Sequence, residues 1–114
     1  MGFVAIMAQP MATSQDFANW VCSDALDPAF LMHALIRSRK ELRELATGAT
    51  HKTIYMPTLE SFHVCAPKLE TQRRIVHALK LQLAEAETLR VALDAQQSGL
   101  AALPRRLLAQ AFED

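Results

Sequence analysis

The chain has 114 residues, of which 51% are hydrophobic, and its 12 lysines and arginines balance 12 aspartates and glutamates. This length suffices for one small domain with a helical appendage, and the apolar fraction excludes an intrinsically disordered chain. Nucleic-acid-binding domains usually carry a clear positive excess, which a formal net charge of zero does not provide. Any contact with DNA is therefore expected to come from a local patch.

The cysteine content and the opening segment indicate a cytoplasmic protein. Cys22 and Cys65 are too few and too far apart to form a disulfide scaffold, so we expect free thiols. The apolar start of the chain has no basic segment ahead of it, unlike a signal peptide. No apolar run reaches the length of a membrane span, and we expect no membrane partner.

The first quarter of the chain predicts two short strands. Residues 2–9 are apolar and are bounded by Pro10, which suits a buried strand. Residues 17–22 predict a second strand, with Trp20 and Val21 available for a core. Further along, residues 54–55 and 62–65 predict strands on either side of a turn at residues 56–58, where Pro57 disfavours continuous sheet pairing.

Asp27 and Pro28 predict the start of a helix over residues 27–47. Aspartate at an N-cap accepts hydrogen bonds from the first backbone donors, and proline at the first helical position loses no hydrogen bond. Leu31, Ala34, Leu35, Leu42 and Leu45 recur at helical spacing on one side. Gly48 is the residue type that ends helices in a left-handed conformation.

The outer face of this predicted helix is basic. Arg37 and Lys40 each have a glutamate four residues ahead, at the spacing of an ion pair within a helix, whereas no acidic residue follows Arg39 or Arg43 at that spacing. Two arginines on one face can clamp a phosphate, and a solvated helix face is the alternative. With the polar loop that follows, the candidate DNA-binding residues are Arg39, Arg43, Thr50, His51, Lys52 and Thr53.

The last third of the chain predicts a coiled-coil helix. Apolar residues recur at alternating steps of four and three, which is a heptad seam that requires a facing helix. The predicted partner-helix interface consists of Ile75, Leu79, Gln82, Ala86, Leu89, Leu93, Leu100, Leu103 and Leu107, with Gln96 and Gln110 as further polar seam positions. Because proline removes a backbone donor, we expect a kink or break between residues 98 and 104, near Gly99 and Pro104. A short helix is expected to resume over residues 105–112.

Several short motifs occur in a fixed order along the chain. They are Gly48-Ala49-Thr50, an internal Leu59, the run Val64-Cys65-Ala66-Pro67-Lys68-Leu69-Glu70-Thr71-Gln72-Arg73-Arg74-Ile75-Val76, and a final Ala111-Phe112. This series resembles the C-terminal portion of the specificity subunits of type I restriction-modification systems. The chain departs from that family pattern at Cys65 and Lys68, where the family usually has proline, and at Thr71, where it usually has glutamate.

The resemblance implies a fold and a role. It implies an α+β fold, with a small partial target-recognition domain over residues 1–66 and a spacer helix, or coiled-coil dimerisation region, over residues 67–114. It also implies a non-catalytic component that helps to choose the DNA site, with double-stranded DNA and the modification (methyltransferase) subunit as partners. In that family the spacer helix packs on a second spacer helix and on helices of the modification subunit.

Other classes of function have little support in the sequence. Three scattered glycines form no phosphate-binding loop, and no nucleophile and base can be paired, so we expect neither an enzyme nor a cofactor. His63 and Cys65, even with Cys22 or His51, lack the spacing of a zinc site, and no metal is expected. The alternative function is a truncated coiled-coil interaction module that dimerises through the long helix and binds no DNA.

Overall fold

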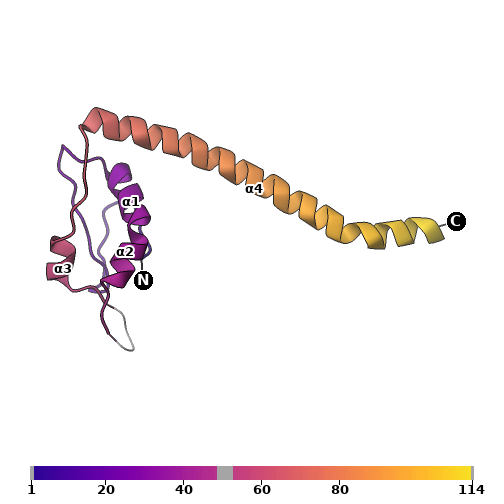
Figure 1. Ribbon diagram of the computed structural model, residues 1–114, viewed down its shortest axis with the longest axis horizontal. Coiled ribbons are helices and arrows are strands. Elements are labelled where there is room, and N and C mark those ends of the chain that lie inside the picture. The colour runs from indigo at the N-terminus through magenta and orange to yellow at the C-terminus, as the bar shows by residue number, and fades with distance from the viewer. Residues whose placement is uncertain (1, 49–52, 114) are drawn as a thin grey trace. The chain divides into compact units, whose positions relative to one another are not determined.

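The computed structural model describes residues 2–48 and 53–113. Over these residues the chain forms four helices, shown in Figure 1: α1 (Pro28–Arg37), α2 (Arg39–Glu44), α3 (Met56–Glu60) and α4 (Leu69–Phe112). The chain divides into two compact units, one ending at His77 and the other beginning at Ala78. Since this boundary lies inside α4, the first turns of that helix belong to the N-terminal unit.

The start of α1 is set by its N-cap, Asp27. One oxygen of this side chain, Oδ1, accepts hydrogen bonds from the backbone N–H groups of Ala29 (2.9 Å) and Phe30 (3.0 Å). The proline that follows Asp27 occupies the first turn, where its missing N–H has no intrahelical partner to lose. The predicted helix start at Asp27 and Pro28 is confirmed.

The single helix predicted over residues 27–47 is instead two helices that meet at Ser38. The backbone ψ of Ser38 is 8°, far from the value of about −42° in an α-helix, although the N–H of Leu42 still donates to its carbonyl at 2.9 Å. Serine favours such departures because it is a weak helix former. α2 ends with Leu45 as its C-cap, so Gly48 lies beyond the helix end that it was expected to form.

The strands predicted for the N-terminal half are wrong. In the described part of the chain no residue belongs to a strand, and the one β-pairing is an isolated antiparallel bridge between Thr47 and Thr53. A strand needs a hydrogen-bonded neighbour and a covered face. Residues 2–9 and 17–22 have no such neighbour among the described residues, and Phe3 is 94% exposed. The α+β fold class is therefore overturned, and the described chain is helical with extended connections.

The region predicted as two strands and a turn forms a short helix. The strands expected at residues 54–55 and 62–65 do not form, and α3 occupies the place of the turn. Pro57 lies in the first turn of α3, which tolerates proline. The carbonyl of Tyr55 accepts from the N–H of Leu59 at 3.1 Å, which closes that turn. Local turn chemistry thus prevailed where no neighbouring strand was available.

The hydrophobic core of the described residues is small. Its buried apolar members are Leu31 and Leu35 on α1 and Val76 near the start of α4. The predicted apolar face of the first helix is therefore confirmed at Leu31 and Leu35, whereas Leu45 is 45% exposed. A core of this size contributes little stability by itself, which gives hydrogen bonds a larger share in holding the N-terminal unit together.

The long helix α4 is continuous over 44 residues and includes Pro104. Of the kink or break predicted between residues 98 and 104, the break does not occur, because the hydrogen bonds on either side carry the helix across one missing donor. Figure 1 shows the ribbon of α4 changing direction toward its C-terminal end, a bend of the kind that proline and glycine cause. The predicted separate segment at residues 105–112 is the last part of the same helix.

Candidate nucleic-acid interface and helix junction

Three of the six candidate DNA-binding residues line one cavity of the N-terminal unit. Arg39 and Arg43 reach it from α2, Thr53 reaches it from the chain ahead of α3, and the cavity has a volume of about 710 Å³. The two arginines lie four residues apart, so they share a face of the helix. The fold thus places two guanidinium groups and a hydroxyl around a single hollow.

Arg39 is held against the N-terminal segment. Gly2 has a φ of 95°, a left-handed conformation that favours glycine, and a Cβ at this position would lie only 3.2 Å from Cγ of Arg39. The Nε atom of Arg39 is buried and has no hydrogen-bond partner among the described residues. An unsatisfied buried donor of this kind costs roughly 1–3 kcal/mol.

The loop between α2 and α3 is closed by two paired threonines. The N–H of Thr47 donates to the carbonyl of Thr53 at 3.1 Å, and the N–H of Thr53 donates to the carbonyl of Thr47 at 3.0 Å. Gly48 opens the loop with a φ of 121°, a conformation that a side chain would strain. Thr53 is exposed at the base of this loop. The other three candidates lie in the loop, outside the described residues: Thr50, His51 and Lys52.

The junction between α1 and α4 is built around one fully buried side chain, Gln72. Its Oε1 accepts from the N–H of Asp27 at 2.8 Å. Its Nε2 donates to the carbonyls of Ala25 at 2.9 Å and Pro67 at 2.7 Å. Both amide hydrogens and the carbonyl oxygen of this side chain are therefore used. A single glutamine ties the N-cap of α1 to Pro67, two residues before α4 begins.

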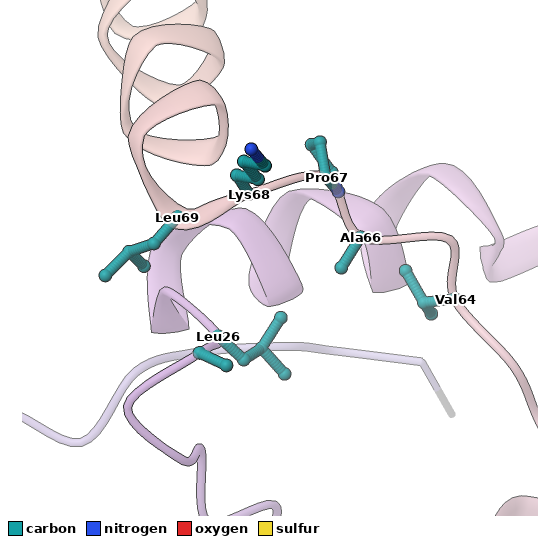
Figure 2. A pocket seen from close by; sticks show the side chains of 7 residues that line it. Leu26, Val64, Ala66, Pro67, Lys68 and Leu69 are labelled. Atoms are coloured by element: carbon teal, nitrogen blue, oxygen red, sulfur yellow. The ribbon is translucent and has the colours of Figure 1, made fainter.

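An open hollow of about 670 Å³ lies beside this junction (Figure 2). Figure 2 shows the side chains of Leu26 and Ala66 directed toward one another, with Pro67 and Lys68 on the outer side of the chain. The lining is aliphatic apart from Lys68. It offers no combination of groups for acid–base catalysis, and we interpret it as the surface that surrounds the entry into α4.

The predicted partner-helix interface is accessible along α4. Leu89, Leu93 and Leu100 expose 61%, 55% and 69% of their surface. The remaining predicted members are exposed too, except Leu79, which is half-buried: Ile75, Gln82, Ala86, Leu103 and Leu107. Gln72 lies seven residues before Leu79 and so continues the same heptad position backwards. The N-terminal unit thus buries the heptad position at Gln72, which lies just before the predicted seam, whereas Ile75 and the seam positions after Leu79 are exposed.

Sequence reasoning missed two parts of this arrangement. Phe17 and Tyr55 were assigned to strands, whereas they line the cavity together with Trp20. Trp20 and Val21 were assigned to a core, whereas they are 46% and 98% exposed. The role of Gln72 was also missed, although a polar residue inside a run that resembles a family motif is a usable signal for a specific contact.

The described residues form neither a metal-ion cluster nor a membrane-spanning helix. Within residues 2–48 and 53–113, no group of three or more histidine, cysteine or acidic side chains is arranged to hold a metal ion. Cys22 and Cys65 are free thiols. The helices formed by these same residues include none with the length and apolar character needed to cross a membrane.

Comparison with known proteins identifies the family. The model of the type I restriction modification DNA specificity domain matches residues 1–89. Comparisons with curated proteins and with solved structures gave no match. The family match covers more than half of the chain and includes α1 to α3, the Gln72 junction and the first part of α4. The chain therefore belongs to the family of type I restriction-modification DNA specificity domains.

Proposed function

We propose that this chain is a non-catalytic component of a type I restriction-modification complex that binds double-stranded DNA and docks the modification subunit. In this proposal residues 1–66 form part of a target-recognition domain and residues 67–114 form the spacer helix. The observation that carries the proposal is the family match over residues 1–89, in a chain whose long helix leaves a heptad seam exposed.

The DNA-binding part of the proposal rests on the basic side of α2. Arg39 and Arg43 line one cavity with Thr53, and the loop closed by Thr47 and Thr53 begins next to them. Arginine suits phosphate because its planar fork of donors matches two phosphate oxygens. A local patch of this kind can act in a chain whose net charge is zero.

The DNA-binding part is tested by the salt dependence of affinity for duplex DNA. The variant Arg39→Ala with Arg43→Ala should weaken binding and reduce the slope of log affinity against log salt concentration by up to about two, because each lost phosphate contact releases one counterion fewer. The matched control is Arg105→Ala with Arg106→Ala, which removes the same charge near the end of α4. An unchanged slope in the α2 variant would remove these arginines from the DNA interface.

The docking part of the proposal rests on α4. Beyond Ala78 this helix exposes leucines at heptad spacing, and a seam of this kind is stable in water when a partner helix covers it. Molar mass from light scattering, for the chain alone and mixed with a type I modification subunit from the same source, tests the docking. A stable mixed complex supports it, and a mixture that stays separate contradicts it.

A second candidate function is a helix-docking module that binds no DNA. The zero net charge and the exposed seam favour it. The two candidates differ in one measurement, which is binding to duplex DNA at moderate salt. A purified chain that forms a defined homodimer through α4, ignores the modification subunit and leaves DNA unbound would establish this second function.

A further inference from the structure

The cavity beside Arg39 has an aromatic lining that contact with duplex phosphates does not require. Phe3, Phe17, Trp20 and Tyr55 contribute to this lining, and they come from three separate segments of the N-terminal unit. All four are exposed, from 46% at Trp20 to 94% at Phe3. Aromatic rings gathered around an open hollow provide flat apolar surfaces on which a planar ligand can stack.

Positive charge borders the same hollow. Arg39 and Arg43 line it alongside the aromatic side chains, and Asp16 is the acidic residue of the lining. Nε of Arg39 is buried without a hydrogen-bond partner among the described residues. An anionic ligand in the hollow would be attracted by the positive charge of these two arginine side chains.

The volume of the cavity suits a small-molecule ligand. A volume of about 710 Å³ lies within the range of roughly 300–1,000 Å³ that is usual for small-molecule sites. A ligand that combines a planar ring with an anion would use the aromatic side chains and the guanidinium group together. Nucleoside phosphates have this combination, because the base is planar and the phosphate prefers an arginine.

We propose that this cavity binds one nucleotide, with its base stacked among Trp20, Tyr55 and Phe17 and its phosphate held by Arg39. Such a nucleotide could come from an unpaired position in DNA or from a free mononucleotide, and the two share the same chemistry. For DNA, the inference rests on the proposed DNA-binding function. It adds to that function a site for a single base outside the duplex stack.

The test uses the fluorescence of Trp20, the one tryptophan of the chain. The full chain is titrated with deoxyadenosine monophosphate, with a short single-stranded oligonucleotide, with duplex DNA and with inorganic phosphate. We expect saturable quenching by the mononucleotide, by the single strand or by both, and no quenching by inorganic phosphate, which lacks a base. Quenching by the single strand alone assigns the site to DNA, and quenching by the mononucleotide assigns it to a free ligand as well.

Two variants make the test specific. Tyr55→Ala should lower the affinity for the quenching ligand roughly tenfold, which is the scale of one lost base-stacking contact. Arg39→Met should also lower this affinity, although it preserves the apolar stem of the side chain. The matched control is Phe112→Ala, which removes an aromatic ring that is 85% exposed at the end of α4. Far-UV circular dichroism confirms that each variant is folded.

The outcomes separate this inference from the proposed function. Duplex binding without saturable quenching by either the mononucleotide or the single strand would overturn the nucleotide site and leave the DNA-binding function standing. Quenching by the mononucleotide without duplex binding would support the site and contradict the DNA-binding function. Quenching that Tyr55→Ala and Arg39→Met both leave unchanged would also overturn the site.

Discussion

The N-terminal unit and the part of α4 that begins at Ala78 are stabilised in different ways. In the N-terminal unit, Gln72 bonds to groups 45 and 47 residues away along the chain, at Asp27 and Ala25. In the C-terminal unit the side-chain hydrogen bonds among described residues join neighbours three or four positions apart, as between Arg90 and its partners Glu87 and Asp94. One unit depends on contacts distant in sequence, and the other depends on local helix formation.

This difference indicates how the two units respond to partners. The N-terminal unit already covers its few buried side chains, whereas the helix beyond Ala78 has exposed leucines with nothing in its own unit to cover them. A helix with an open apolar stripe gains stability from an added helix, while a hydrogen-bonded junction gains little. We therefore expect mutations in α4 to act on assembly and mutations at the junction to act on folding.

The largest expected effect is on assembly, from Leu89→Asp. An unpaired carboxylate in a covered seam costs on the order of 3–5 kcal/mol, which corresponds to a loss of affinity of about a hundredfold to a few thousandfold. The mixed complex with the modification subunit should therefore disappear from light scattering at micromolar concentration. Ala84→Asp, on the opposite side of α4, is the matched control and should retain more binding. An unchanged molar mass for the Leu89 variant would remove the seam from the partner interface.

The next largest effect is on folding, from Gln72→Leu. Leucine leaves the N–H of Asp27 and the carbonyls of Ala25 and Pro67 without their partner, and we expect a loss of roughly 3 kcal/mol in the free energy of unfolding. Urea unfolding monitored by Trp20 fluorescence reports on this unit. Gln96→Leu, at an exposed seam position, should leave that transition in place. Equal stability in the two variants would mean that the junction is not what holds the N-terminal unit together.

A smaller effect is expected from Asp27→Ala. This change removes the acceptor for the N–H groups of Ala29 and Phe30, and loss of an N-cap costs about 1 kcal/mol. Asp27→Asn keeps a capping oxygen and should retain most of the stability. The urea midpoints of the wild type, Asp27→Asn and Asp27→Ala, measured by Trp20 fluorescence, give the order of their stabilities. A variant with alanine that is as stable as the one with asparagine would argue against the cap.

The smallest effect concerns pH and the exposed ion pairs of α4. The hydrogen bond from Arg90 lowers the pKa of Glu87 and raises the pKa of Arg90 itself. Because the folded pKa of Glu87 lies below its unfolded value, the pair supports the helix above the unfolded pKa and loses that support as pH falls through the folded pKa. NMR titration should therefore find the pKa of the Glu87 carboxyl below its usual range, and Arg90→Ala should return this pKa toward its usual value. High salt should weaken the effect, and a Glu87 pKa unmoved by Arg90→Ala would contradict it.

Part of the candidate site could be predicted from local pattern. Arg39 and Arg43 were recognised because residues four apart share a helix face, and both line the cavity. The aromatic members could not be found in this way, since Phe3, Trp20 and Tyr55 come from segments that are brought together only by folding. The loop residues Thr50, His51 and Lys52 remain predictions outside the described part of the chain.

The sequence by itself determined those features that depend on neighbours along the chain. Asp27 caps a helix because its side chain reaches donors two and three residues ahead, and the heptads after Ile75 form a long helix because each hydrogen bond spans four residues. Only the tertiary structure decided that residues 2–9 form no strand, because a strand depends on a distant partner to receive its hydrogen bonds. It also decided that Gln72 joins α1 to α4, because a buried amide bonds to whichever backbone groups the fold brings within 3 Å of it.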